Sequence, residues 1–103
     1  MDTYSDLRID RSLGEGGSPI ILILSGDLDV RTAPILRNFI DKAINNGDVN
    51  LHLDLSKLSY LDSSGYVALV EANRRTRATS GSLSLTKLPQ HLRDFFDMTV
   101  LEA

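Results

Sequence analysis

The short segment Asp62-Ser63-Ser64-Gly65 holds the side chains of this chain that are best suited to chemistry. It follows an apolar stretch and precedes a helical pattern, so we expect it where a loop becomes the N-terminus of a helix. A hydroxyl at that place is exposed to other proteins, and glycine tolerates the close approach of another backbone. Ser, Asp and Gly are also ordinary capping residues, so spacing alone favours a helix cap over a functional turn.

A second polar segment, Gly26-Asp27-Leu28-Asp29, places two carboxylates two residues apart after an apolar run. If that run is a strand of a parallel sheet, the carboxylates lie at the sheet edge where functional groups gather. The other interpretation is a solvated turn before a helix, capped by either Thr32 or Asp29.

The sequence contains no motif of a known catalytic centre. It lacks a G-x-S-x-G turn, an H-E-x-x-H pair and a glycine-rich phosphate loop, and its histidines, His52 and His91, are isolated. With no base paired to it, Ser63 is better interpreted as the substrate of a kinase than as a nucleophile. The absence of cysteine excludes disulfides and Cys-based zinc sites. We therefore predict no enzyme activity, no catalytic residue, no metal and no cofactor.

Size and charge limit the choice of partners. A chain of 103 residues fits one domain, spanning residues 1–103. The net charge of -3 is spread over interleaved acidic and basic residues, which argues against nucleic acid as a partner. No apolar run approaches the ~20 residues that span a bilayer, and the acidic N-terminus is unlike a signal peptide. We expect a soluble, cytoplasmic protein that binds neither nucleic acid nor a membrane.

Four segments have the pattern of strands. Alternating or continuously apolar residues predict strands at residues 7–13, 20–24, 49–55 and 82–85. Ser25-Gly26 is expected to end the second strand, and Leu58 to Leu61 to lead into the following helix.

Three segments have the pattern of helices. Apolar residues at three- and four-residue steps predict a helix from Ala33 to Asn46 and a second helix from the Asp62 segment up to Gly81. Pro89 opens a short third helix, whose Leu92, Phe95 and Phe96 are expected to face the core.

The order of these elements predicts a mixed α/β sheet. The first two strands, joined by a loop, should be antiparallel, and strands separated by helices should be parallel. We expect four to five strands, with the helices mainly on one face.

The polar segments, taken with their surroundings, resemble a known family. Segment 53–69, LDLSKLSYLDSSGYVAL, is similar to the signature of STAS domains in anti-sigma factor antagonists. Gly26-Asp27-Leu28-Asp29 resembles the family's first loop, and Leu92 to Thr99 its closing helix and turn. The resemblance covers nearly the whole chain and implies a single STAS domain.

The resemblance implies a partner-switching mechanism. The unphosphorylated domain would bind an anti-sigma factor serine kinase of the histidine-kinase-like ATPase fold, freeing a sigma factor or other effector. Phosphorylation of Ser63 would abolish this binding, and a phosphoserine phosphatase would restore it. Asp29 and Asp62 match family positions at the kinase-facing surface. The partner-binding residues are expected to be Asp27, Asp29, Asp62, Ser63, Ser64, Gly65 and Tyr66.

Two alternatives stay open. The same fold serves as a scaffold or as a lipid-transport subunit without a phospho-switch, and fold alone does not choose between these roles. A receiver domain, which takes phosphate onto its own aspartate, would use Asp54, the Asp27 and Asp29 pair and Lys87. The predicted antiparallel hairpin breaks receiver topology.

Overall fold

The computed structural model describes residues 6–13, 19–48 and 50–94. The elements in chain order are β1 (Leu7–Leu13), β2 (Ile20–Leu28), α1 (Ala33–Asn45), β3 (Asn50–Leu61), α2 (Ser63–Ala78), β4 (Ser82–Thr86) and α3 (Gln90–Arg93). Each predicted strand and helix is present. Of the expected core residues of the third helix, Leu92 is buried, whereas Phe95 and Phe96 lie outside the described residues.

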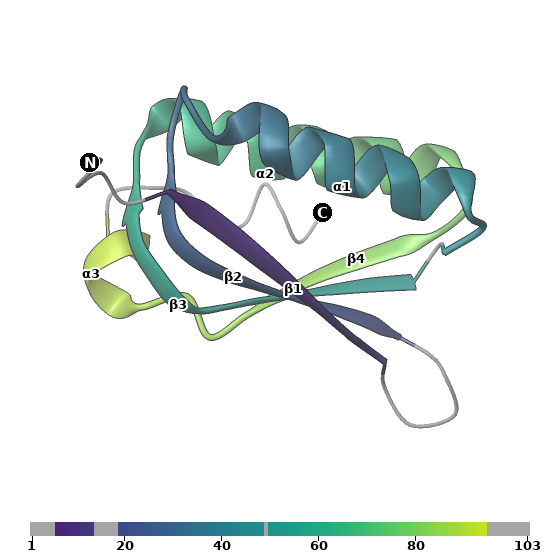
Figure 1. Ribbon diagram of the computed structural model, residues 1–103, viewed down its shortest axis with the longest axis horizontal. Coiled ribbons are helices and arrows are strands. Elements are labelled where there is room, and N and C mark those ends of the chain that lie inside the picture. Colours follow the sequence, from purple (N-terminus) through teal and green to yellow (C-terminus); the bar gives the residue numbers. More distant parts are fainter. Residues whose placement is uncertain (1–5, 14–18, 49, 95–103) are drawn as a thin grey trace.

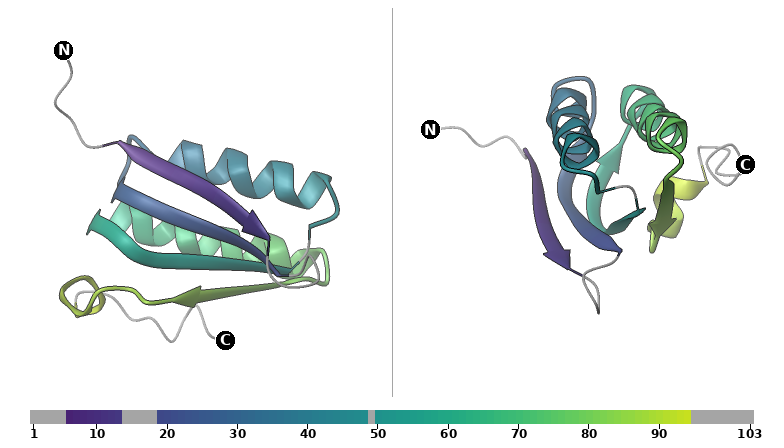
Figure 2. Two further views of the ribbon diagram at one scale, coloured as in Figure 1. Left: turned by 60° about the horizontal axis from the view of Figure 1, so that its bottom comes forward. Right: turned by 90° about the vertical axis from the view of Figure 1, so that its right-hand side faces the viewer.

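The four strands form one mixed sheet in the order β1-β2-β3-β4. β1 pairs antiparallel with β2, whereas the pairs β2–β3 and β3–β4 are parallel. α1 and α2 lie next to each other over the same face of the sheet (Figures 1 and 2). The predicted mixed α/β sheet is confirmed. Its antiparallel hairpin rules out the receiver topology considered above.

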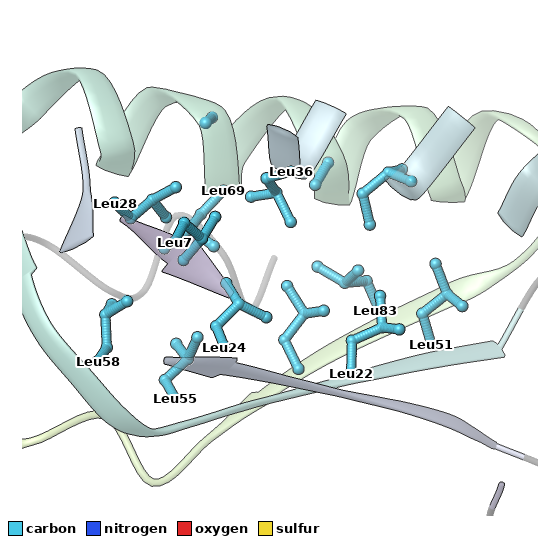
Figure 3. Packing of buried hydrophobic residues seen from close by; sticks show 14 of the residues in the cluster. Leu7, Leu22, Leu24, Leu28, Leu36, Leu51, Leu55, Leu58, Leu69 and Leu83 are labelled. Carbon is cyan, nitrogen blue, oxygen red and sulfur yellow. The ribbon is translucent and has the colours of Figure 1, made fainter. Parts of the chain in front are cut away.

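Leucine side chains fill the space between the sheet and the two long helices (Figure 3). β2 contributes Leu22 and Leu24, which alternate with half-buried Ile21 and Ile23 on the opposite face. α1 and α2 supply a matching apolar stripe that includes Leu36, Ile40 and Leu69, each at most 1% exposed. Burying one such side chain stabilises the fold by roughly 1.5 to 3 kcal/mol. This layer holds the N-terminal ends of both helices against the sheet.

β2 does not end at Ser25-Gly26, as the sequence predicted, but continues to Leu28. Its register against β3 shifts between Ile23 and Ser25 and again between Gly26 and Asp27, so the strand absorbs the irregularity as bulges. Gly26 has a φ of +103°, and a Cβ there would collide with the backbone oxygen of Asp6. Glycine at this position therefore keeps β1 and β2 paired instead of separating them.

β3 also runs further than predicted, from Asn50 to Leu61. The alternation of apolar and polar residues predicts a strand that ends at residue 55, where the alternation stops. Beyond Leu55 the buried residues are Leu58 and Leu61, which are three apart, since the shifted register with β2 rotates the strand. A period-two pattern cannot detect such a strand end.

Candidate functional site

The two polar segments singled out in the sequence meet at the carboxyl ends of the neighbouring strands β2 and β3. β2 and β3 are paired to their last residues, with Asp27 opposite Tyr60 and Leu28 opposite Leu61. The backbone nitrogen of Asp62 lies 3.4 Å from the Leu28 carbonyl oxygen, its acceptor. The loops that follow the two strands therefore start side by side, as parallel strands require.

Asp62, not Ser63, caps α2. Its Oδ1 accepts a hydrogen bond of 2.9 Å from the backbone nitrogen of Gly65, and its backbone is extended. Ser63 is the first residue of the helix and is exposed. In the described part of the chain no hydrogen bond holds the Ser63 hydroxyl. The capping interpretation thus applies to the aspartate and leaves the serine hydroxyl available to another protein.

Gly65 is the point where α2 touches the end of β2. It is buried, and a Cβ there would collide with the Leu28 carbonyl oxygen and lie 2.8 Å from Cδ1 of Leu61. The close backbone approach expected at this glycine is made by the chain's own strand. The next residue, Tyr66, is half-buried and packs against the hydrophobic core.

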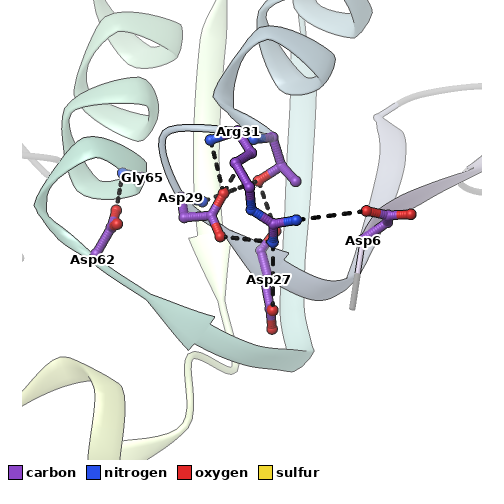
Figure 4. A network of polar contacts seen from close by, with 7 residues as sticks. Asp6, Asp27, Asp29, Arg31, Asp62 and Gly65 are labelled. Atoms are coloured by element: carbon purple, nitrogen blue, oxygen red, sulfur yellow. Dashed lines mark hydrogen bonds and ion pairs between the residues drawn. The ribbon is translucent and has the colours of Figure 1, made fainter. Parts of the chain in front are cut away.

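Asp29 stabilises the loop before α1 through several hydrogen bonds (Figure 4). Its Oδ1 accepts from the backbone nitrogens of Arg31 at 2.9 Å and Thr32 at 3.2 Å, and its Oδ2 accepts from Arg31 Nη2 at 3.0 Å. Thr32 stands at the N-cap position, but its side chain makes no cap bond; Oγ1 donates to the Asp27 carbonyl oxygen at 2.7 Å. Thr32 therefore occupies the N-cap position of α1, as one of the two interpretations predicted, and the Asp29 carboxylate binds the backbone N–H groups of the two residues that lead into the helix.

The same contacts explain the charge state of Asp29. Burial, with only 8% of the residue exposed, would raise the pKa of this carboxyl. The hydrogen bond from the Arg31 side chain, those from the backbone of Thr32 and Arg31, and the Arg31 charge outweigh burial and lower the pKa. Asp29 is thus ionised and is committed to contacts within its own loop.

Arg31 is a charged residue of this edge that the sequence analysis did not single out. Its guanidinium also lies 3.9 Å from carboxylate oxygens of Asp27 and Asp6, and its side chain is 47% exposed (Figure 4). In the sequence, Arg31 follows Asp29 by two residues and Asp27 by four, and this spacing was the available signal. The turn at Asp29 brings Arg31 to Asp27 and Asp29, and the pairing of β1 with β2 brings Asp6 to the same guanidinium.

A groove of about 460 Å³ lies between the N-terminal parts of α1 and α2. Ser63 and Ser64 stand on its α2 side, and Val30 and Pro34 on its α1 side. It was not predicted from the sequence, because it depends on how two helices far apart in the chain pack.

Among the residues that the structure describes, the histidine of β3 is committed to contacts within the sheet. His52 lies on β3, where both ring nitrogens are 2.8 Å from hydroxyls of Ser84 and Thr86 on β4. Among the described residues no group of three or more His, Asp or Glu is placed to hold a metal ion. Ser63 is thus an exposed serine at the first position of α2.

A family model described as "Mlab, STAS domain" matches residues 12–103. The chain belongs to the STAS domain family. The anti-sigma-B factor antagonist of Bacillus subtilis is 29% identical to this STAS domain over 96 residues, covering 93% of this chain and 87% of the relative. The protein of the same name from Listeria monocytogenes is 29% identical over 82 residues, covering 80% and 72%.

Solved structures share the fold of this STAS domain. The anti-sigma factor antagonist SpoIIAA in its unphosphorylated form superposes with a TM-score of 0.68 at 22% identity, covering 88% of this chain and 83% of that chain. The phosphorylated form of SpoIIAA from Bacillus also gives 0.68, at 21% identity, covering 92% and 86%. Within the described residues of this STAS domain, no helix is both long and apolar enough to cross a membrane.

Proposed function

We propose that this STAS domain is an anti-sigma factor antagonist that acts by partner switching. Unphosphorylated, it binds an anti-sigma factor serine kinase of the histidine-kinase-like ATPase fold, and a sigma factor or other effector is released. Phosphorylation of Ser63 ends this binding, and a phosphoserine phosphatase reverses the modification. The names of the relatives support an anti-sigma factor as the partner. The kinase fold, the phosphatase and the choice of Ser63 are what the resemblance of segment 53–69 implies, and the exposed position of Ser63 supports that choice.

One observation carries the choice of Ser63: the residue is exposed, and no hydrogen bond joins its hydroxyl to another described residue. The N-terminus of α2 is capped by Asp62, so Ser63 can be modified without loss of a structural hydrogen bond. Partner contacts are then made by Ser63, Ser64, Asp27 and Tyr66. Asp29, Asp62 and Gly65 act on the same surface as positioning residues, because the two carboxylates accept hydrogen bonds from backbone N–H groups of this chain and Gly65 is buried against Leu28.

Phosphate at Ser63 would act on the interface and leave the fold intact. It adds about 1.5 to 2 negative charges next to Asp62, at an edge that already carries Asp27 and Asp29. A partner that packs against this edge would have to bury those charges. The helix N-terminus partly stabilises an anion, so α2 should remain folded.

The test is phosphorylation in vitro. The protein is incubated with ATP and each candidate serine kinase of the histidine-kinase fold from the source organism, followed by intact-mass measurement and peptide mapping. We expect one phosphate on Ser63, none on Ser63→Ala and an unchanged yield on Ser64→Ala. Stable binding of a kinase without any modification would contradict the phospho-switch.

A second candidate is a STAS scaffold or lipid-transport subunit without a switch. The matched family carries a description, "Mlab, STAS domain", that differs from the names of the curated relatives. Copurification from the source organism separates the two roles: a kinase-like partner supports the antagonist, and a membrane transporter subunit supports the alternative.

A further inference from the structure

The α1–α2 groove has an apolar part and a charged part. Apolar side chains line the part near the N-termini of the helices, and an ion pair lies at its other end. Its open part is lined by Val30, Ala33 and Pro34 on one side and by Val67 on the other. Ser63, Val67 and Glu71 follow one another at four-residue steps, so they form one face of α2 toward the groove. Ser63 therefore stands one helical turn before Val67 on the wall of the groove.

Ion pairs between the helices close the far part of the groove. Arg37 Nη2 lies 3.4 Å from Glu71 Oε1, and one turn further along Arg75 pairs with Asp41. Arg37 and Glu71 are the charged residues of the groove lining, and they neutralise each other. The groove consequently presents no net charge, and a charged group that entered it would lose water without gaining an opposite charge.

The apolar residues at the mouth are exposed beyond what the fold needs. Val30 is 68% exposed and Val67 is 52% exposed, whereas Leu69 on the opposite side of α2 is fully buried. Two exposed valines in the lining of a neutral groove match an uncharged, apolar side chain, which would cover them from water.

We propose that the kinase that modifies Ser63 inserts an apolar side chain between Val30 and Val67. The inference rests on the proposed function and adds the contact that anchors the partner. A protein whose active site reaches the Ser63 hydroxyl must lie over the groove, because Ser63 is part of its wall. The anchor also gives phosphorylation its effect: a phosphate at the mouth retains water, so the apolar side chain can no longer be buried beside it.

The experiment compares Val30→Ser and Val67→Ser with the matched control Leu13→Ser. Leu13 is 61% exposed and pairs with Ile20, at the opposite end of β2 from Leu28. Each variant is titrated with the kinase that phosphorylates the wild-type protein. We expect each valine variant to weaken the dissociation constant about tenfold, as loss of an interface anchor does, and the control to stay within about twofold. Urea unfolding of each variant confirms that it is folded.

The outcomes separate this inference from the proposed function. If the wild-type protein is phosphorylated and both valine variants bind as it does, the groove is not the anchor and the proposed function stands. A control that loses as much affinity as the valine variants would also overturn the inference. If no candidate kinase binds or modifies the wild-type protein, both the proposed function and the anchor are wrong.

Discussion

At the scale of single residues, Asp62 and Asp29 lie close to the same ends of β2 and β3 but stabilise different parts of the backbone. Asp62 uses one carboxylate oxygen to cap α2, whereas Asp29 holds two backbone N–H groups and the Arg31 guanidinium. Both were expected from the resemblance to contact a partner, and each has a structural partner inside the chain. Their substitution would therefore alter the partner surface through the loops that they hold.

Acid should weaken the fold through Asp29. Its pKa is lowered in the folded state, so between the folded pKa and about 3.9 the unfolded chain binds more protons. The stabilisation is complete above about pH 4 and is lost as the pH falls through the folded pKa. We expect Asp29→Asn to be less stable at neutral pH and to lose less stability than wild type on acidification, measured by urea unfolding across this range.

The control for this prediction is Asp10→Asn, at an exposed carboxylate on β1 that pairs with Arg8 at the surface. Its pH dependence should follow that of the wild-type protein. Equal pH dependence in wild type and Asp29→Asn would show that the buried hydrogen bonds do not hold the Asp29 charge.

At the scale of elements, the site depends on how closely α2 approaches β2. The contact of Gly65 with Leu28 and Leu61 leaves no room for a side chain, although alanine is intrinsically a better helix former. Packing and propensity thus oppose each other at this position, and the contact is with backbone, which cannot move aside easily.

Gly65→Ala tests which effect is larger. We expect the substitution to lower the free energy of unfolding by about 1 to 3 kcal/mol, because α2 must shift away from the strand. Ser64→Ala, its neighbour in the same helical turn, should change it by less than about 0.5 kcal/mol. Urea unfolding at neutral pH measures both. A Gly65→Ala protein as stable as wild type would mean that α2 is free to move at its N-terminus.

At the scale of the whole molecule, α2 serves two surfaces. One side belongs to the leucine-rich layer over the sheet, and the other faces the groove beside Ser63. Because the single layer joins all four strands and both long helices, we expect the domain to unfold in one cooperative transition.

Leu69→Ala and Val67→Ala separate the two surfaces. The first removes a fully buried side chain and should cost about 2 to 5 kcal/mol of unfolding free energy. The second removes a side chain that is 52% exposed and should cost less than about 0.5 kcal/mol. Calorimetric or urea unfolding measures both. A comparable loss from Val67→Ala would show that this valine serves the fold rather than a partner.

Periodicity in the sequence determined the number and order of the elements, the opening hairpin and the helix that begins at the Asp62 segment. These depend on local patterns of apolar residues, which neighbouring positions suffice to encode. The tertiary structure alone decided where β2 and β3 end, because bulges change the register between strands. It also decided that Asp62 rather than Ser63 caps α2, that Asp29 pairs with Arg31, and that Val30 and Val67 line the same groove. The first two contacts join residues two or three apart and depend on the conformation of a turn, whereas the third depends on the packing of two helices that are far apart in the chain. The period of apolar residues encodes neither.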